Sequence, residues 1–341
     1  MKFEKLIAPS SESEIIKHWK YIDKTYITVV CNTFNQGKYI RDAIESFLAQ
    51  ECECKFEIII HDDCSTDDTV TILKQYKKRY PNIIKLILQN ENQFSKNISY
   101  PFKCAIEMAS GLYSAICEGD DFWIDKKKLQ KQYCALEGNP NVYIAVHDAK
   151  CIYEDGNQGD YSFMIYSQKD KVIGFENFAK VSTQFSPTAS MFCVTSKLLE
   201  ATRKLKKAPC LDIYWEMILG VNGFYYSPKS MSVYRLGTKG SYSARNKSNV
   251  SKSLEFKHKT IAFYEGLTFD GMRRHSKVLS KKLKYLKKNL AYFEARFGNL
   301  SSSELMSLYG QSFMLSNINL KQELVILCRV FGINLSKFIG K

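Results

Sequence analysis

Acidic residues gather at two places where an apolar run of sequence gives way to a polar one. His61-Asp62-Asp63 follows the apolar residues 56–60, and Glu118-Gly119-Asp120-Asp121 follows the apolar residues 112–117. Carboxylates can accept hydrogen bonds from a base or a ribose, and they are also ligands that Mg²⁺ and Mn²⁺ prefer. A cation held by one or two carboxylates and a diphosphate would neutralise charge on a departing nucleotide. We therefore expect both clusters to be functional.

The apolar runs alternate with helical patterns, which predicts an α/β fold. We expect strands at 26–31, 56–60, 83–88 and 112–117, and helices at about 39–50, 69–80, 101–110 and 127–136. Near-continuous apolar strands are typical of a parallel sheet covered on both faces. Ligands of such sheets bind beyond the carboxyl ends of the strands, where both acidic clusters and Asn32-Thr33-Phe34-Asn35 lie. Beyond residue 141 the pattern loosens, with strands expected at 142–146, 190–194 and 231–234 and a helix at 211–221.

Several nucleotide- and metal-binding classes lack their signatures here. The chain has neither a GxGxxG motif nor a P-loop lysine motif, which disfavours a Rossmann dehydrogenase and a P-loop NTPase. The five histidines are not spaced as zinc ligands. The residues Ser65-Thr66-Asp67-Asp68 suit a helix cap as well as a binding loop, and both readings stay open.

Four segments in register resemble family 2 glycosyltransferases with the GT-A fold, especially bacterial enzymes that build capsule, lipopolysaccharide or glycoprotein glycans. The segments span residues 27–35, 56–69, 111–113 and 117–123, followed by Lys128-Leu129 and Gln132. They cover about a third of the chain, within residues 25–140, and weaker matches follow at 211–215 and 234–236. The resemblance implies a Rossmann-like domain for nucleotide-diphosphate sugars.

The resemblance also implies roles for individual residues on the donor side. Glu118-Gly119-Asp120 stands where the family has Asp-x-Asp, so Asp120 would bind Mn²⁺ or Mg²⁺, and Glu118 would face the ribose or a metal-bound water. Gln93 stands where the family often has glycine. The remaining residues would contact the nucleotide-sugar: Thr33, Asn35, Asp63, Asn92, Asp121 and Arg235. Asp63 would bond the base, and Arg235 would reach the diphosphate; an ordinary surface ion pair is the alternative for Arg235.

An inverting transferase needs a base that removes the proton of the acceptor hydroxyl. The resemblance implies Asp212, at the expected start of a helix; Glu216 is the second candidate and Asp148 the third. Asp212 would also suit a helix cap. Trp123 and Trp215 could stack on a sugar ring or belong to the core, and both readings stay open.

The C-terminal part of the chain is basic and helical in pattern. Of the net charge of +14, residues 251–341 carry +10, from 16 Lys/Arg and 6 Asp/Glu. Apolar residues recur there at spacings of four and three: Leu279, Leu283, Leu286, Leu290, Phe293 and Phe297. The face opposite this stripe is basic. We expect the stripe to pack on the protein or on a second copy, as a homo-oligomer, and the basic face to meet an anionic membrane. No nucleic-acid-binding module is recognisable.

Eleven scattered cysteines favour a reducing compartment, and neither a signal peptide nor a membrane-spanning run is evident. We therefore expect a cytoplasmic protein, peripheral at the inner face of the plasma membrane. The expected domains are an N-terminal extension (1–24), a GT-A domain (25–245) and a helical appendage (246–341). The favoured reaction is transfer of a sugar from a UDP-sugar to a saccharide or lipid-linked acceptor. A nucleotidyltransferase and a non-catalytic membrane- or partner-binding adaptor are the alternatives.

Overall fold

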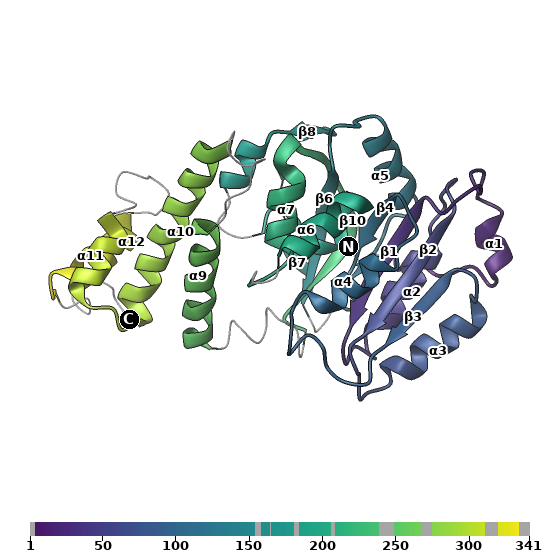
Figure 1. The fold of residues 1–341 in the computed structure, drawn as a ribbon, viewed down its shortest axis with the longest axis horizontal. Helices are drawn as coiled ribbons and strands as arrows, with labels where there is room; N and C mark the ends of the chain where they lie inside the picture. The colour runs from purple at the N-terminus through teal and green to yellow at the C-terminus, as the bar shows by residue number, and fades with distance from the viewer. Residues whose placement is uncertain are drawn as a thin grey trace. The chain divides into compact units, whose positions relative to one another are not determined.

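The computed structural model describes residues 4–153, 158–163, 165–180, 184–205, 209–238, 249–266, 275–310 and 320–333. The chain forms two compact units (Figure 1). Unit 1 comprises residues 1–175 and 184–241, and unit 2 comprises residues 176–183 and 242–341. The domain boundary expected near residue 245 lies outside the described residues.

Unit 1 is built on a ten-stranded mixed sheet in which the strands follow the order β3-β2-β1-β4-β9-β6-β10-β5, while β7 pairs with β6 and β8 with β10. The strands are β1 (Ile27–Thr33), β2 (Phe56–Asp62), β3 (Ile84–Leu88), β4 (Tyr113–Ile116), β5 (Phe122–Trp123), β6 (Ile144–Tyr153), β7 (Gln158–Ser162), β8 (Lys171–Ile173), β9 (Phe192–Val194) and β10 (Phe224–Leu236). Strands β3, β2, β1 and β4 are parallel, as expected. Strand β9 instead runs antiparallel to both β4 and β6. Its three residues are too few to reveal a direction in the sequence.

Helices cover both faces of the sheet, because the central strands are apolar on both sides. One face packs against α2 (Ile40–Leu48), α3 (Thr69–Arg79) and α5 (Lys128–Glu137). The other packs against α4 (Tyr100–Glu107) and α6 (Thr195–Lys204), and α7 (Asp212–Leu219) packs against α6. Short 3₁₀ turns occur at Phe175–Lys180, Thr188–Ser190 and Gly220–Asn222.

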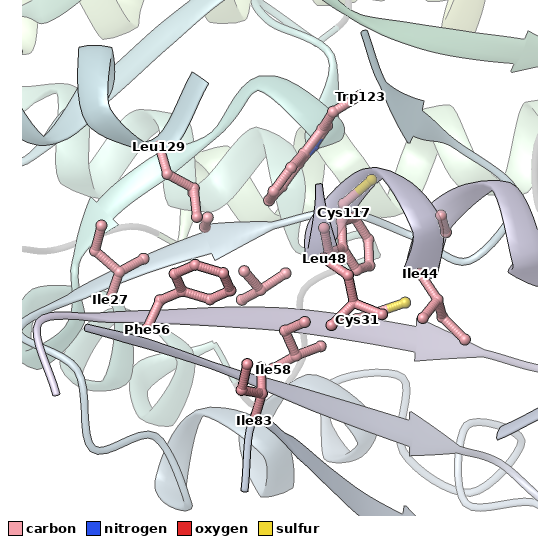
Figure 2. Close-up of a cluster of buried hydrophobic side chains, with 14 of the residues drawn as sticks. Ile27, Cys31, Ile44, Leu48, Phe56, Ile58, Ile83, Cys117, Trp123 and Leu129 are labelled. Carbon is pink, nitrogen blue, oxygen red and sulfur yellow. The ribbon is translucent and has the colours of Figure 1, made fainter. Parts of the chain in front are cut away.

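The core on the α2 face joins side chains from distant parts of the sequence (Figure 2). Ile27 and Cys31 of β1 lie in it beside Phe56 and Ile58 of β2. The helices contribute Ile44, Leu48 and Leu129, and Trp123 closes the cluster. The segment before the sheet also belongs to this core, because Ala8 is buried in it together with Ile15 of α1 (Glu12–Ile16).

The start of β4 approaches β1 so closely that only glycine fits at position 111. A Cβ atom there would lie 2.5 Å from the Thr28 nitrogen and 2.6 Å from the Ile27 carbonyl carbon. The Gly111 N–H donates to Thr28 Oγ1 at 2.9 Å, and Thr28 Oγ1 donates to Glu57 Oε1 at 2.8 Å. This contact fixes β4, and therefore the acidic turn that follows it, against β1.

Unit 2 is helical, with α9 (Val250–Glu265), α10 (Ser276–Phe297), α11 (Ser302–Gly310) and α12 (Leu320–Val330) (Figure 1). Its core contains Ala291, Ala295, Leu305, Tyr309, Val325 and Ile326. Within the described part of the chain, no helix is both long and apolar enough to cross a membrane.

The face of α10 that was expected to be basic and exposed is partly buried. Lys282 Nζ donates to the Phe178 carbonyl at 3.0 Å and lies 3.9 Å from the centre of that ring. Lys288 is buried and pairs with Glu323 at 2.6 Å. Long lysine stems can be buried in this way when the ammonium finds a partner. Lys277, Lys281 and Lys284 remain exposed, and Arg273 and Arg274 lie outside the described residues.

Candidate functional site

The predicted site residues converge at the carboxyl edge of the parallel strands. Strand β1 ends at Thr33 and β2 at Asp62, and these two residues are partners in the sheet register. Strand β4 also runs parallel to β1, so the turn at 118–121 emerges at the same edge. The convergence follows from the parallel arrangement that the sequence pattern predicts.

Asn35 connects the loop after β1 to the loop after β2. Its side-chain Oδ1 accepts from the Thr66 N–H at 2.7 Å, and its own N–H donates to Ser65 Oγ at 2.8 Å. Asn35 has φ +52°, a left-handed conformation that asparagine tolerates better than most residues. Asp62 in turn accepts from the Ser65 N–H at 2.9 Å. The two loops therefore form one rigid rim of the site.

Asp63 ties a third loop to this rim. Its N–H donates to the Thr33 carbonyl at 3.0 Å, and its carboxylate accepts from the N–H groups of Gln93 (2.8 Å) and Phe94 (3.0 Å). The Asn92 amide reaches the Asp63 carbonyl at 3.4 Å. A carboxylate has about four acceptor positions, so Asp63 retains capacity for a ligand. Gln93, which stands where the family often has glycine, makes this contact through its backbone N–H. The contact can therefore form without a glycine at position 93.

The acidic turn after β4 is packed tightly on the end of β1. The Gly119 N–H donates to the Asn32 carbonyl at 2.9 Å, and the Asp121 N–H donates to the Glu118 carbonyl at 3.1 Å. A Cβ on Gly119 would lie 2.5 Å from Gln36 Oε1. Glycine at position 119 therefore lets the three acids of the turn lie beside the loop after β1.

The turn concentrates negative charge in a buried place. Burial raises the pKa of Asp120, and this effect exceeds the opposite effect of a hydrogen bond from Thr238 Oγ1 at 2.9 Å, which lowers the pKa. Burial, and then the charge of Asp120, raise the pKa of Asp121. Burial, followed by the charges of Asp120 and Asp212, raises the pKa of Glu118. A cation or a positively polarised ligand at this turn would relieve the repulsion.

Unpartnered buried polar atoms collect at the same edge. Five buried side-chain atoms of this region have no hydrogen-bond partner: Asn32 Oδ1, Thr33 Oγ1, Gln36 Oε1, His61 Nδ1 and Asp121 Oδ2. Buried polar groups in native proteins are nearly always bonded, so their concentration here fits a place that takes a polar ligand.

The donor set of the turn fits a hard divalent cation. Mg²⁺ and Mn²⁺ take oxygen ligands and are commonly held by one or two carboxylates, waters and substrate phosphates. Asp120 and its neighbours Glu118 and Asp121 offer carboxylate oxygens, and the charge of Asp120 contributes to the raised pKa of both neighbours. In the described residues, no group of three or more His, Cys, Asp or Glu side chains could hold a metal ion by itself.

Asp212 lies near this turn although about ninety residues separate them. Its charge contributes to the raised pKa of Glu118, which places the two carboxylates within electrostatic reach of each other. Asp212 starts α7, is partly exposed, and accepts from the Ile213 N–H at 2.8 Å and from the Cys210 thiol. Burial raises the pKa of Asp212.

The two other candidate bases are engaged with neighbouring protein groups. Glu216 is fully buried, and its carboxylate accepts from the N–H groups of Phe185 (2.8 Å) and Ser186 (2.6 Å) and from Ser186 Oγ (2.8 Å). Asp148 is buried and accepts from Ser230 Oγ. Among the three, Asp212 is the most exposed.

Arg235 lies under the acidic turn. Its N–H donates to Asp121 Oδ1 at 2.9 Å, and its guanidinium donates to the Asp120 carbonyl through Nη1 and to Asp42 Oδ2 through Nη2. The rings of Phe122 and Tyr39 lie 4.6 and 5.0 Å from the guanidinium carbon. The guanidinium therefore bonds protein groups through both terminal nitrogens.

The structure also settles the environment of the two tryptophans and adds residues that sequence reasoning missed. Trp123 and Trp215 are fully buried, and their indole N–H groups donate to the Ala189 carbonyl and Thr202 Oγ1. Both belong to the core. Asp42, Gln36 and Thr238 contact the site residues but were not expected, because an acid in a first helical turn or a threonine after a strand is common for other reasons.

Known proteins share both the sequence pattern and the fold. The sequence profile of "Glycosyl transferase family 2" matches residues 28–195. Residues 28–195 form a family 2 glycosyltransferase domain. An uncharacterized protein of Mycobacterium tuberculosis is 41% identical over 130 residues, which are 38% of this chain and 37% of that protein. The Escherichia coli enzyme WfaP, a UDP-Glc:α-D-GlcNAc-diphosphoundecaprenol β-1,3-glucosyltransferase, is 33% identical over 101 residues, 30% of this chain and 38% of its own.

Two solved structures show the fold over nearly the whole chain. Residues 1–349 of Staphylococcus aureus TarS, in complex with UDP-GlcNAc, match 92% of this chain and 85% of their own at 16% identity and a TM-score of 0.56. The mannosyltransferase PcManGT of Pyrobaculum calidifontis, in complex with GDP-Man and Mn²⁺, matches 96% and 94% at 16% identity and a TM-score of 0.53. The family 2 glycosyltransferase domain therefore has the expected GT-A fold, and a helical region follows it.

Proposed function

We propose that this protein is an inverting glycosyltransferase that moves a sugar from a nucleotide-diphosphate donor, with a UDP-sugar favoured, to a saccharide or lipid-linked acceptor. The observations that carry the proposal are the gathering of Glu118, Asp120 and Asp121 in one turn at the carboxyl edge of the sheet, and the position of Asp212 within electrostatic reach of Glu118. The acidic turn suits the charged part of the donor, and the separate carboxylate suits the acceptor hydroxyl.

The three loops of the rim would hold the nucleotide. Thr33 and Asn35 would line the base pocket, and Asp63 would bond the base through its remaining acceptor positions. Asn92 would help to keep the third loop in place, since its amide already reaches the Asp63 carbonyl. The loops are bonded to one another, so little ordering remains to be done when the donor binds.

Asp120 would be the ligand of a Mn²⁺ or Mg²⁺ ion, with Glu118 facing the ribose or a metal-bound water and Asp121 supporting the turn. The bound cation would supply positive charge against the negative charge of the departing diphosphate. The raised pKa values of Glu118 and Asp121 support this assignment, because they reflect burial first and then the charge of Asp120, which a cation would offset.

Asp212 would accept the proton of the acceptor hydroxyl as that oxygen attacks the anomeric carbon. Its raised pKa makes it a better proton acceptor than an exposed aspartate. Attack opposite the departing diphosphate would invert the anomeric centre. The names of relatives support the substrate classes: WfaP joins a UDP-Glc donor to a diphosphoundecaprenol-linked acceptor.

The test is a thermal-shift titration of the full chain with UDP, GDP, CMP and dTDP, each with and without Mn²⁺. A ligand that binds the native state raises the melting temperature by mass action. We expect the largest shift with UDP, an increase of that shift with Mn²⁺, and loss of the Mn²⁺ increase in Asp120→Asn.

Asp23→Asn is the matched control, because Asp23 is an exposed aspartate before β1, at the opposite edge of the sheet from the site. It should keep the nucleotide shift of the wild type. Absence of a shift with every nucleotide, with or without Mn²⁺, would refute the donor site. Release of pyrophosphate from a nucleoside triphosphate would instead favour a nucleotidyltransferase.

A further inference from the structure

Arg235 and Asp42 form a largely buried ion pair beside the acidic turn. The Arg235 side chain is 6% exposed and the Asp42 side chain is 20% exposed. Asp42 stands in the first turn of α2 and accepts from Arg235 Nη2, whereas Nη1 donates to the Asp120 carbonyl of the acidic turn. Moving two charges out of water costs free energy, which is recovered only when both charges are well paired and hydrogen-bonded. The other contacts of the two side chains therefore matter.

Arg235 joins three separate elements through this pair. Its backbone N–H and its guanidinium hold Asp121 and the Asp120 carbonyl, respectively. Its second terminal nitrogen is held by Asp42 of α2. The flat guanidinium lies near the rings of Phe122 and Tyr39, which restricts it further. Arg235 of β10 therefore holds the acidic turn, and Asp42 of α2 holds the Arg235 side chain in place.

The end of β10 reinforces the same turn. Val233 pairs with Phe122, and Thr238 Oγ1 donates to Asp120 Oδ2 at 2.9 Å. The N-terminal segment also reaches this support, because Lys5 Nζ lies 2.8 Å from Asp42 Oδ2. Asp42 therefore bonds both Arg235 and Lys5.

We propose that Asp42 and Arg235 act together as positioning residues for the proposed transfer reaction, holding the 118–121 turn in the arrangement that takes the donor, and that Arg235 does so without contacting the diphosphate. The inference rests on the proposed function. It gives Arg235 a different role from the diphosphate contact that the family resemblance implies. It also adds Asp42, which no sequence motif indicated.

A diphosphate contact and a positioning pair predict different effects on the binding of UMP and UDP. An arginine that contacts the second phosphate matters for UDP and not for UMP, and it acts without Asp42. A positioning pair affects every ligand that touches the turn, and either partner is useless without the other. Residues that act as one unit show strongly non-additive effects in a double-mutant cycle.

The experiment measures thermal-shift affinities of UMP and UDP, with Mn²⁺, for the wild type, Asp42→Asn, Arg235→Lys and the double variant. We expect each single variant to weaken both nucleotides by about tenfold, and the double variant to weaken them no further, since coupling energies of neighbouring residues reach about this size. Asp42→Asn keeps an acceptor for Arg235 and is the variant least prone to misfold. Arg203→Lys and Glu107→Gln alter an exposed pair on α6 and α4 and should behave as wild type.

Two results would overturn the inference while leaving the proposed function intact. One is wild-type affinity in Asp42→Asn, and the other is an Arg235→Lys loss for UDP that exceeds the loss for UMP by more than about threefold, roughly the discrimination of one lost hydrogen bond. Absence of any nucleotide shift in the wild type would refute the proposed function itself, and this inference with it.

Discussion

Asp212 and Glu216 stand one helical turn apart in α7, but their surroundings differ. Asp212 is partly exposed, whereas Glu216 is fully buried and accepts three hydrogen bonds from residues 185 and 186. A base must reach the acceptor hydroxyl, and Glu216 faces protein donors instead. We infer that Glu216 anchors the 184–190 segment and that Asp212 is the base.

Asp212→Asn should therefore lower the transfer rate by at least about 100-fold, because an amide cannot accept the proton. Glu216→Gln should instead lower stability by about 1–3 kcal/mol, since one amide nitrogen would face backbone N–H groups. Melting temperature and transfer rate, measured on both variants, separate the two roles. Unchanged stability in Glu216→Gln together with complete loss of transfer would make Glu216 the base.

Lys128 is a buried charge that gives a pH-dependent prediction. Burial lowers the pKa of Lys128 to about 7, although Nζ donates to Gln132 Oε1 at 2.7 Å and lies 4.1 Å from the centre of the Trp123 ring. An unfolded lysine has a pKa of about 10.4. Between these values the unfolded chain holds a proton that the folded chain has lost, so this residue makes stability rise with pH. Below pH 7 its full destabilising effect is present.

Lys128→Met should remove this contribution. The melting temperature of the variant relative to wild type should be highest near pH 6 and should fall as the pH rises towards 9. All other groups are common to the two proteins, so the difference reports on Lys128. A difference that stays constant across this pH range would mean that Lys128 keeps its charge in the folded protein.

Gly111 shows how one backbone position controls a whole element. A methyl group there would meet the backbone of Ile27 and Thr28 at 2.5–2.6 Å, and backbone cannot yield as a side-chain tip can. Gly111→Ala should therefore destabilise unit 1 by more than about 3 kcal/mol, as overpacking of a rigid site does. It should also displace β4 and weaken nucleotide binding.

Gly138→Ala is a suitable control, because its new Cβ would approach one carbonyl oxygen at 3.3 Å and nothing closer. Denaturant unfolding of both variants measures the difference. Equal stabilities would show that β4 can shift away from β1 at little cost, contrary to the close packing described above.

Among the helices and strands, those with a clear periodic pattern were predicted from the sequence, and the shortest strands were missed. Strands β1 to β4 and the helices between them follow from apolar runs and periodicity, and each was expected within a few residues. Strands β5 and β8 have two and three residues, which is too short for a pattern. Helix α6 was missed as well, because two of its four buried residues are threonines and the apolar pattern is therefore weak.

The sequence pattern indicated site residues where each directly follows a strand of the parallel sheet. Asp63 and the 118–121 turn directly follow strands, so parallel pairing alone brings them together. The Asp42–Arg235 pair joins residues 193 positions apart, and neither residue stands in a motif that names its partner. Such long-range pairs follow from the whole sheet order, which periodicity does not determine.

At the scale of the whole molecule, the charge of unit 2 is more structural than its composition indicates. Lys287 pairs with Glu265, Lys288 pairs with Glu323, and Lys282 is bonded to the Phe178 carbonyl. These lysines stabilise the helical unit rather than offering charge to a partner. On α10, Lys277, Lys281 and Lys284 are exposed, and their spacing of four and three residues places them on one face of that helix.

The three exposed lysines give this face of α10 a positive charge. We expect the full chain to bind vesicles that contain an anionic lipid such as phosphatidylglycerol, because each lysine near such a surface contributes about 1 kcal/mol. Replacing Lys277, Lys281 and Lys284 together with glutamine should weaken partitioning by up to about 100-fold at low salt, and high salt should reduce wild-type binding. The control changes the same charge in unit 1, through Lys24, Lys74 and Lys78, which are also exposed. If both triple variants lose binding equally, the attraction belongs to the net charge of the protein and not to this face of α10. If neither loses binding, the basic face has no part in membrane association.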